Sequence, residues 1–590
     1  GRDLYSDGEV EEVLLDIAKN HSPEEFNRII AEKESWAVLY HFSHVRQNIV
    51  EWLPIQKTDR VLEVGAGCGA ITGMLADKAK DVTCIDLSRM RSHINAYRNR
   101  EKDNMQILVG NFQDIARDLK PEYDYITLIG VFEYADGYIG GETPYVDMLR
   151  QISGLLAPGG KIVIAIENRL GLKYWAGCTE DHVGTFFEGL EGYPNTHGIR
   201  TFSKKELLEM FQQAGDLHSR FYYPYPDYKL PMAVYSDSFL PKRGELTNDP
   251  RNLDRVRIDL FNEARVYDTL IENELFPAFS NSFLAVLEKE EMPEEQVLYT
   301  KYSNERSRKY AITTKIIRQE QGRMVRKEAC YPEGNTHVQR LTEWYQALSK
   351  VYRGTKLCMN RCAGTDAYAD FEYLEGHTLE EELDQLVAQA EKEAFREKML
   401  DYLQLIEGAG VERMFTRTAE FEAVFGRAEL PEGLRSAVVT DVDMVCNNVL
   451  ITGDDRWTLI DYEWTCTFPV PVHFVLYRVI HYYTMKNAKP QWVYDMDLYG
   501  EMGITKEEQA VYAEMEQHFQ HYMKQEHVSI PDMYQAISPG TININRLQEQ
   551  IIHLQHKNDV LADRVAYKDE VIRQMENTKV WKLYRKIKKK

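Results

Sequence analysis

The chain has 590 residues, 44% of them hydrophobic, and a net charge of −22. It is too long for one hydrophobic core, so we expect three or four folding units. The acidic balance argues against general nucleic-acid binding, because nucleic-acid phosphates would repel the protein. No apolar run is long enough to predict a membrane-spanning helix. The eight cysteines lack zinc-ligand spacing, which favours a reduced, cytoplasmic compartment.

Short helices are expected before the first strand. Residues 1–35 form acidic amphipathic patterns, and Ser22–Glu25 is a typical helix start. Trp36–Trp52 predicts a further helix, which carries Tyr40 and Arg46. This helix either only covers the edge of a sheet or closes over a bound ligand.

A glycine-rich turn follows in Arg60–Ala76. The apolar run Val61–Val64 predicts a buried parallel strand, and residues 70–76 predict a helix. Glycine lets the backbone turn sharply and approach a phosphate or nucleotide without a Cβ in the way. The next strand ends in Asp86, where a carboxylate can bind ribose hydroxyls. The turn contains Gly65, Gly67 and Gly69, and Glu63 precedes them.

The segments that follow separate two cofactors. Gly65, Gly67 and Ala70 also fit the G-x-G-x-x-A pattern of NAD-binding proteins. The E-x-G-x-G-x-G run, however, resembles the first motif of class I S-adenosylmethionine (SAM) methyltransferases. Later segments match that family in order, namely Asp86 for the ribose, Asn111 and Phe112 beside the adenine, Tyr123–Ile129 as strand four and Leu155–Lys161 before strand five.

This resemblance implies a Rossmann-like α/β domain over residues 36–240, with a mostly parallel seven-stranded sheet. It implies SAM as cofactor, bound by Glu63, Gly65, Gly67, Gly69, Asp86, Asn111 and Phe112.

Two residues are candidates for catalysis in this domain. Glu133 follows strand four, a segment that lines the meeting point of cofactor and acceptor in such methyltransferases; otherwise it is a helix cap. His182 lies in a long glycine- and aromatic-rich insertion after strand five, as part of Glu180-Asp181-His182. Histidine titrates near neutral pH and could serve as general base, unless the segment is a surface turn. Three adjacent residues have poor geometry for binding one metal ion, so we do not expect a metal site in this segment.

A second domain is expected over residues 255–535, after a polar linker near Pro241. We expect a helix over Asp254–Glu274, and then strands at Phe283–Leu287, Val297–Tyr302, Tyr310–Ile317 and Arg323–Cys330. Two later segments, Val438–Ile451 and Trp457–Trp464, resemble the core of the protein-kinase-like fold, closest to the aminoglycoside- and choline-kinase branch. The resemblance implies a two-lobed α+β domain that uses ATP and Mg²⁺.

The kinase-like roles fall on particular residues of this sequence. Asp443 matches the catalytic Asp that accepts the hydroxyl proton, and Asn448 and Asp461 match the metal ligands. Upstream, we expect Lys327 to bind phosphates with Glu343 as its ion-pair partner, although Lys301 and Lys315 compete. Glu372 begins a segment, residues 372–376, that resembles the adenine-binding hinge.

Because the sequence departs from that family at two points, a kinase-like domain without catalytic activity is the alternative. Asp441 stands where the family has histidine before the catalytic Asp. The expected phosphate-covering loop, Ser303–Lys309, contains no glycine, although Arg306 or Arg308 could contact phosphate by charge.

The C-terminal region predicts a coiled coil over residues 542–577 and a basic amphipathic tail over residues 578–590. A heptad stripe favours a parallel dimer, with a trimer as the alternative; the helix could otherwise fold back on the chain. The stripe consists of Ile544, Leu547, Ile551, Leu554, Asn558, Leu561, Val565, Lys568, Ile572 and Met575. In the tail, basic and apolar residues alternate, which suits an anionic membrane surface.

The order of these parts resembles the bifunctional methyltransferase/kinase family that terminates bacterial O-antigen chains. This resemblance implies a lipid-linked polysaccharide acceptor, glycosyltransferase partners and peripheral attachment to the inner face of the cell membrane. One alternative is a sugar O-methyltransferase whose kinase-like domain only senses nucleotide or glycan. A second is a scaffold that recruits glycosyltransferases.

Overall fold

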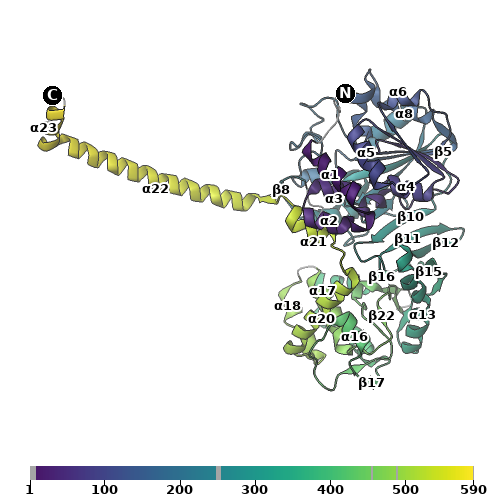
Figure 1. Cartoon of the computed structure of the whole chain (residues 1–590). Coiled ribbons are helices and arrows are strands. Elements are labelled where there is room, and N and C mark those ends of the chain that lie inside the picture. Colours follow the sequence, from purple (N-terminus) through teal and green to yellow (C-terminus); the bar gives the residue numbers. More distant parts are fainter. Residues whose placement is uncertain (1–7, 248–253, 454–455, 487–488, 589–590) are drawn as a thin grey trace.

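The fold is described by a computed structural model for residues 8–247, 254–453, 456–486 and 489–588 (Figure 1). Helices near the two ends of the chain pack together in one apolar cluster. Phe26 and Leu39 of the N-terminal helices share it with Met533 and Ile537 of α21. The elements involved are α1 (Glu9–Asn20), η1 (Pro23–Glu25), α2 (Phe26–Lys33), α3 (Trp36–Phe42), η2 (His44–Ile49) and α21 (Ile530–Ile537).

The helix predicted over Trp36–Trp52 is interrupted at Ser43. The backbone of Ser43 is extended, and its hydroxyl accepts a hydrogen bond from the amide of Val45, at 3.3 Å. Serine competes for backbone donors in this way and so begins the short helix η2.

A sheet of thirteen strands runs through most of the molecule, in the order β14-β15-β12-β11-β10-β7-β6-β9-β5-β4-β1-β2-β3. Strands β1 to β5 are parallel to one another, as the sequence predicts. The strands of this first part are β1 (Arg60–Val64), β2 (Asp81–Asp86), β3 (Met105–Val109), β4 (Tyr123–Ile129), β5 (Leu156–Glu167), β6 (His218–Tyr225), β7 (Ala233–Ser236) and β9 (Ser282–Glu288).

Apolar side chains leave the parallel strands toward two different clusters. Leu62 and Ile164 belong to the cluster on one face, and Val61 and Val163 belong to the cluster on the other. This alternation follows from the two-residue period of a strand, and it makes the sheet the buried middle layer. The accompanying helices are α4 (Thr72–Lys78), α5 (Arg89–Arg98), α6 (Phe112–Ala116), η3 (Phe132–Tyr134), α7 (Ala135–Ile139), α8 (Pro144–Ser153), α9 (Leu172–Trp175) and α10 (Lys204–Gln213).

Strand β9 corrects one sequence-based expectation. The sequence predicts that Phe283–Leu287 belongs to the second domain, but β9 lies between β5 and β6 and is antiparallel to both. Every residue of β9 is buried. The region expected as one helix, Asp254–Glu274, instead contains β8 (Arg257–Asp259) and α11 (Glu263–Glu272), followed by α12 (Phe276–Phe279). The first compact unit therefore extends to β9, well past residue 240.

The same sheet continues into the second part of the chain. The strands predicted after β9 form an antiparallel set that meets the first part where β10 pairs with β7. They are β10 (Val297–Ser303), β11 (Ile312–Gln319), β12 (Gly322–Ala329), β14 (Cys362–Gly364) and β15 (Tyr368–Glu372). The helix α13 (Asn335–Val351), preceded by η4 (Pro332–Gly334), packs against β12, β14 and β15.

A mainly helical unit follows, with its own large apolar cluster. Its small sheet has the order β13-β21-β20-β16. The helices are α14 (Leu379–Ala388), α15 (Lys392–Gly408), α16 (Ala419–Phe425), η5 (Cys446–Asn448), α17 (Val472–Met485), α18 (Gln491–Tyr494), α19 (Leu498–Glu501) and α20 (Lys506–Lys524). The strands are β13 (Leu357–Met359), β16 (His377–Thr378), β17 (Arg413–Met414), β18 (Arg435–Ser436), β19 (Thr440–Asp441), β20 (Val449–Thr452), β21 (Arg456–Leu459) and β22 (Thr465–Cys466).

The chain then returns to the first part before it leaves the body. Strand β23 (Thr541–Asn543) pairs in parallel with β8, and the long helix α22 (Ile544–Asn577) projects away from both parts (Figure 1). Apolar heptad residues such as Ile551 and Leu561 are about half exposed on it. The short helix α23 (Lys579–Lys588) follows. Within the described ranges, no helix combines the length and apolarity needed to cross a bilayer.

Candidate active sites

The glycine turn after β1 packs tightly on one side and is open on another. Gly65 has φ +72°, and a Cβ there would lie 2.3 Å from Cγ2 of Val131, in the segment after β4. Gly67 has φ +53°, yet an added Cβ would meet no atom within 4 Å. The first glycine thus permits close backbone packing, and the second leaves room beside the turn for a ligand.

Asp86 faces this turn from the end of β2. Its two carboxylate oxygens accept hydrogen bonds from the amides of Gly67 and Ser88, both at 2.8 Å. A carboxylate has about four lone-pair positions, so it can accept further bonds from ligand hydroxyls. Asn111 and Phe112 follow β3, the neighbouring strand, and Asn111 caps α6 by accepting a bond from the amide of Gln113. Parallel neighbouring strands therefore bring these predicted residues to one edge of the sheet.

Glu63 lies beneath the turn rather than along it. Its side chain is 3% exposed, and Oε2 accepts a 2.6 Å hydrogen bond from the hydroxyl of Thr72 in α4. The thiol of Cys84 in β2 contacts the same oxygen at 3.5 Å. Burial raises the pKa of Glu63 to about 7. The contacts make Glu63 a link between β1, β2 and α4, so it supports the turn from inside.

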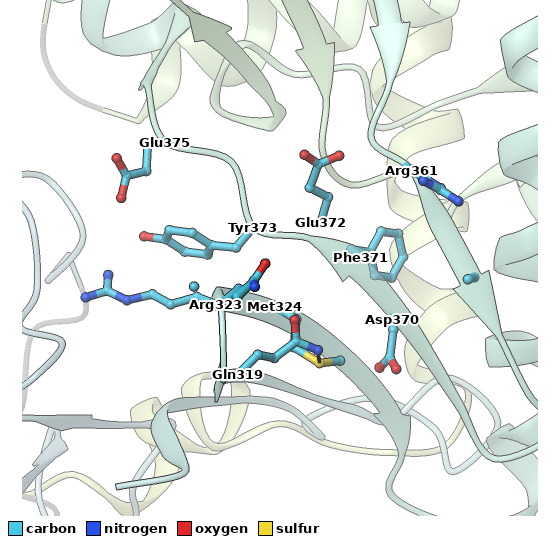
Figure 2. A pocket seen from close by; sticks show the side chains of 12 residues that line it. Gln319, Arg323, Met324, Arg361, Asp370, Phe371, Glu372, Tyr373 and Glu375 are labelled. Atoms are coloured by element: carbon cyan, nitrogen blue, oxygen red, sulfur yellow. Dashed lines mark hydrogen bonds between the residues drawn. The ribbon is translucent and has the colours of Figure 1, made fainter. Parts of the chain in front are cut away.

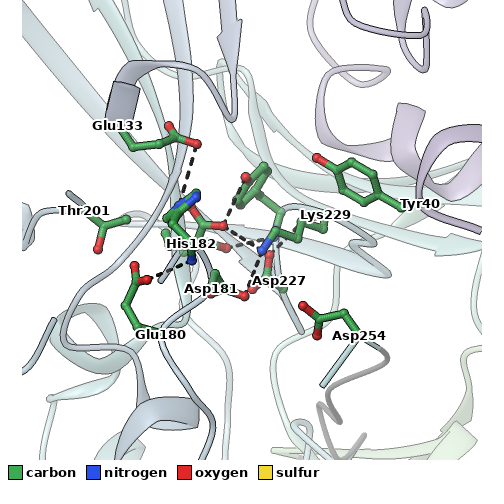
Figure 3. A network of polar contacts seen from close by, with 12 residues as sticks. Tyr40, Glu133, Glu180, Asp181, His182, Thr201, Asp227, Lys229 and Asp254 are labelled. Carbon is green, nitrogen blue, oxygen red and sulfur yellow. Dashed lines mark hydrogen bonds and ion pairs between the residues drawn. The ribbon is translucent and has the colours of Figure 1, made fainter. Parts of the chain in front are cut away.

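Two of the predicted catalytic residues, Glu133 and His182, meet at the carboxyl ends of β4 and β5 (Figure 3). Nε2 of His182 lies 3.9 Å from Oε1 of Glu133 and 3.4 Å from Oε2 of Glu167, the last residue of β5. Nδ1 of His182 lies 3.1 Å from the hydroxyl of Tyr134. The side chains of Glu133, Glu167 and His182 are at most 9% exposed. The insertion after β5 thus covers the sheet edge.

This acceptor cluster, defined as Glu133, Glu167 and His182, is held by ion-pair contacts rather than by hydrogen bonds of good geometry. Within the described residues, neither oxygen of Glu133 has a hydrogen-bond partner, and the same holds for Oε2 of Glu167 and Nε2 of His182, which face each other at 3.4 Å. Buried polar atoms with this spare hydrogen-bonding capacity can bind a polar ligand group. Their ligand atoms lie within 4.8 Å of one another, close enough to hold a metal ion as well.

Lys229, from the turn between β6 and β7, neutralises part of the negative charge of the acceptor cluster. Its Nζ lies 2.7 Å from Oε1 of Glu167 and 2.9 Å from Asp181. Lys173 in turn contacts Asp181 and Asp227, both at 2.7 Å. Burial disfavours the ionised form of Glu167, but Lys229 outweighs it and holds the pKa of Glu167 below its usual range. Glu167 is therefore an anion, fixed in place by its lysine.

Glu133 and His182 share a different electrostatic environment. Burial, reinforced by the neighbouring Glu167, raises the pKa of Glu133 to about 8. Burial would lower the pKa of His182, but the two carboxylates around it raise that pKa to about 9, with Glu167 as the larger influence. At neutral pH both groups hold protons, and both lose them within the mildly alkaline range.

Tyr40 of α3 lies beside Lys229 in the same view (Figure 3). The guanidinium of Arg46, in η2, lies over the Tyr40 ring at 4.2 Å from its centre, and it donates a hydrogen bond to the carbonyl of Lys229 at 3.0 Å. The segment predicted over residues 36–52 thus reaches Lys229, which contacts the acceptor cluster, instead of only covering a distant sheet edge.

A second group of charged side chains lies between the antiparallel strands that include β12 and the mainly helical unit that follows them. Lys327 of β12 is 5% exposed, and its Nζ lies 2.7 Å from Oδ1 of Asp461. Oε1 of Glu463 pairs with Arg306 at 3.0 Å, and Oε2 lies 3.2 Å from Nε2 of His337 in α13. Of the three candidate lysines, Lys327 is therefore the one that contacts Asp461, a predicted metal ligand. Of the competing lysines, Lys315 pairs with Glu328 and Lys301 is exposed.

The predicted catalytic loop forms the other side of this group. The side-chain amide of Asn448 donates to Oδ2 of Asp443 at 3.1 Å, and Arg478 contacts Oδ1 at 2.9 Å. Asp441 is fully buried, and burial together with Asp443 raises the pKa of Asp441 well above its usual range. A buried carboxyl group, whose ionised form is disfavoured by burial and by Asp443, therefore stands where the kinase-like family has histidine.

Two predicted nucleotide-binding residues, Glu343 and Glu372, do not lie beside Lys327. Glu343 is exposed on α13, and Lys327 pairs with Asp461 instead, so the expected Lys327–Glu343 ion pair is wrong. Glu372 pairs in register with Met324, and Lys327 with Ala369. Because side chains alternate along a strand, the Glu372 side chain lies on the opposite face from Lys327.

A pocket of about 650 Å³ occupies the Glu372 face of the sheet (Figure 2). It is lined by Arg323, Asp370 and Tyr373 as well. The Glu372 carbonyl accepts a 3.0 Å hydrogen bond from the side-chain amide of Asn360. The side chain of Glu372 therefore belongs to this pocket, and its carbonyl is already paired within the expected hinge.

Sequence reasoning missed several charged members of both groups: Glu167, Lys229, Glu463, His337 and Arg478. A signal existed for Glu167, since it ends the buried strand β5 as a lone acid. Lys229 and Arg478 carry no such signal, because they lie in a turn and a helix that are far along the chain from the residues they contact.

Comparison with known proteins finds a family match in the part of the chain that contains the first of these two sites. Residues 38–215 match the family described as "Methyltransferase domain". An uncharacterized methyltransferase of Staphylococcus carnosus is 30% identical over 153 residues, which are 26% of this chain and 66% of that relative. Residues 38–215 are thus a methyltransferase domain, while the chain spans less than two thirds of this relative's length.

Two similar solved structures are described as methyltransferases, at low identity. A methyltransferase of Archaeoglobus fulgidus, described as SAM dependent, has a TM-score of 0.27 and 13% identity; the match covers 42% of this chain and 95% of that chain. Haemonchus contortus phosphoethanolamine N-methyltransferase 1, with phosphoethanolamine and S-adenosylhomocysteine, also has a TM-score of 0.27, with 14% identity, and the match covers 50% of this chain and 53% of that chain.

Proposed function

We propose that this protein transfers a methyl group from SAM to an oxygen atom of a glycan. The observation that carries the proposal is the methyltransferase domain of residues 38–215, whose glycine turn opens beside Asp86, on the same sheet edge as the acceptor cluster. SAM, when bound, supplies the electrophilic methyl group. The remaining task of the protein is to hold the acceptor in line and to receive its proton.

The residues divide this task between them. Asp86 accepts hydrogen bonds from the ribose hydroxyls, while Asn111 and Phe112 border the adenine. Glu133 and His182 orient the acceptor hydroxyl, and Nε2 of His182 accepts its proton once the ring is neutral. Lys229 keeps Glu167 ionised and so holds His182 in place. The insertion after β5 shields the cluster from water.

SAM binding by a glycine variant tests the first half of this account. Gly65→Ala should lower SAM affinity at least about tenfold, because the added methyl group collides with Val131 and displaces the turn. Isothermal titration calorimetry measures the affinity. Gly159→Ala is the matched control: it has φ +73° as well, with nothing within 4 Å of the added Cβ. Equal affinities in the two variants would contradict the proposed cofactor site.

We further propose a second activity, ATP-dependent phosphorylation, in the part of the chain that follows β9. Its support is the contact of Lys327 with Asp461, together with Asn448 and Asp443 on one loop. The antiparallel strand order β14-β15-β12-β11-β10, with α13 against it, is compatible with the smaller lobe of a kinase-like fold. ATP, when bound with Mg²⁺, supplies the phosphoryl group; Lys327 would bind its phosphates and Asp461 and Asn448 the metal.

The two activities together would modify, or cap, a lipid-linked surface polysaccharide. Exposed apolar residues on α22 support a homodimer or homotrimer, and α23 exposes Trp581 and Ile587 among basic residues. Such a helix suits the inner surface of a cell membrane, where glycosyltransferases would meet the protein. The alternative is a sugar O-methyltransferase whose second part binds nucleotide or glycan without catalysis, which the replacement of the family's histidine by the buried Asp441 favours.

Titration of ATP with Mg²⁺ separates these alternatives. We expect the wild type to bind ATP and Asp461→Asn to bind it at least about tenfold more weakly, since the variant removes a charged ligand. Asp495→Asn, at an exposed acid in the same half, is the control. Binding without phosphate transfer to a glycan extract would support the non-catalytic alternative. Absence of ATP binding in the wild type would overturn the nucleotide role altogether.

A further inference from the structure

Three metal-binding side chains from distant segments meet at the junction of the two parts of the chain. His44 lies on η2, Glu305 follows β10, and His527 precedes α21. Their ligand atoms all lie within 4.8 Å of one another. None of the three belongs to either charge group described above.

The distances in the cluster fit metal-ligand spacing and are long for hydrogen bonds. Nε2 of His44 and Nε2 of His527 each lie 3.4 Å from the same oxygen, Oε1 of Glu305. A hydrogen bond between such atoms normally measures about 2.7–3.2 Å. Two ligands held at about 2.0–2.2 Å from a tetrahedral ion lie about 3.3–3.6 Å apart. Both histidine–Glu305 distances therefore match the spacing of two ligands that share one ion.

Neighbouring groups hold the cluster in place. The other oxygen of Glu305 accepts a 2.5 Å hydrogen bond from the amide of Ile530. The side chain of Asn27 binds both the amide and the carbonyl of Val528, next to His527, at 2.9 and 2.8 Å. Nε2 of His44 also donates a 3.0 Å hydrogen bond to the backbone carbonyl just before Glu305, and an ion bound at this nitrogen would displace that proton. Fixed outer contacts of this kind orient the ligands of metal sites.

We propose that His44, Glu305 and His527 bind a divalent transition-metal ion of the zinc class. Two imidazoles and one carboxylate form a ligand set that suits Zn²⁺ and leaves a fourth position for water. With its proton on Nδ1, each imidazole offers Nε2 to the ion. The side chains are 12–23% exposed, so an ion can enter while most of its shell is protein.

The ion would join three regions that come from distant parts of the chain. It would tie η2, whose Arg46 contacts Lys229, to the loop after β10 and to the C-terminal segment before α21. The next residue of that loop, Arg306, pairs with Glu463 in the second charge group. Occupancy would therefore fix the loop on which Arg306 stands and hold the two parts in one arrangement.

The test is Zn²⁺ binding by the full-length, chelator-treated chain, in competition with a chromophoric chelator. We expect one equivalent to bind, and Glu305→Gln and His527→Ala each to weaken it at least about tenfold, the lower end of what even outer-shell changes cost. Zn²⁺ should also slow hydrogen exchange in residues 304–311. Co²⁺ in place of Zn²⁺ should give a d–d spectrum without thiolate charge transfer, because the site contains no cysteine.

His21→Ala is the matched control, since His21 and Glu25 form a pair with the same 3.4 Å separation but without a second histidine at the carboxylate. It should leave Zn²⁺ binding unchanged. Glu305→Gln keeps the shape of the side chain, so circular dichroism should confirm that this variant folds. Failure of the wild type to bind one equivalent, unchanged affinity in folded Glu305→Gln, or a thiolate band with Co²⁺ would each overturn the proposal. The result does not depend on SAM or ATP binding.

Discussion

His182 is surrounded by buried carboxylates, and its pKa, raised to about 9, determines how methyl transfer should depend on pH. A protonated ring cannot accept the acceptor's proton. The rate should therefore rise roughly tenfold per pH unit below about pH 8 and level off above about pH 9. Initial rates with saturating SAM measure this profile, and His182→Gln should remove the rise. A profile that is flat in the wild type would contradict the role of His182 as base.

The same shift predicts a change in stability. The folded pKa of His182 lies above its ordinary value of 6.5, so the charged ring stabilises the fold fully below about pH 6.5 and loses this contribution as pH rises through about 9. The difference in unfolding free energy between wild type and His182→Gln should accordingly shrink from pH 6 to pH 10. Urea unfolding measures it at both values. An equal difference at both values would show that folding does not raise the pKa of His182.

At the scale of single residues, motif positions could be predicted but their partners could not. Gly67, Asp86 and Lys327 could be identified because each belongs to a short pattern beside a strand. The contact of Lys327 with Asp461 depends on how the unit that carries Asp461 packs against β12, and no local pattern encodes that packing. Lys229 likewise reaches Glu167 only because β5, β6 and β7 share a sheet.

Among the elements, β9 shows most clearly why the domain boundary could not be read from the sequence. Its apolar run predicted a strand, and the structure confirms one. A strand pattern does not state which sheet the strand joins, however. The partners of β9 lie far back along the chain, since β5 ends at Glu167 and β6 at Tyr225, whereas β9 begins at Ser282. Only the long-range pairing with these two strands decides its place.

The placement of β9 predicts that it supports the methyltransferase domain. Leu284→Ala should lower the free energy of unfolding by about 2–5 kcal/mol, because this fully buried side chain lies in the same apolar cluster as Trp52. Urea unfolding followed by tryptophan fluorescence, together with SAM affinity near the midpoint, measures the effect. Leu275→Ala, at a residue 45% exposed, is the control and should cost less than about 0.5 kcal/mol. Similar costs in both variants would contradict the role of β9.

At the scale of the whole molecule, one sheet joins the two parts and α22 leaves them. The heptad pattern predicted a long helix, and α22 confirms its extent. The sequence could not predict the continuous sheet, because the pairing of β7 with β10 involves short strands without a distinctive pattern. It also could not predict that β23 returns to β8, since the whole second part of the chain separates these two strands.

The exposed stripe on α22 predicts self-association. Replacing Ile551 and Leu561 by Asp should convert a dimer or trimer to a monomer without unfolding the body, because both side chains are about half exposed in a single chain. Sedimentation equilibrium measures the mass, and circular dichroism reports the fold. Tyr567→Asp, at a residue 72% exposed and off the stripe, should keep the oligomer. A monomeric wild type would contradict the coiled coil.

The most direct test of the central claim is transfer of labelled methyl from SAM to an extract of lipid-linked glycan. We predict that the wild type labels the glycan fraction, and that Glu133→Gln binds SAM normally but transfers at least about a hundredfold more slowly, because the acceptor loses its orienting carboxylate. Label that appears in no glycan, or an undiminished rate in Glu133→Gln, would contradict the account.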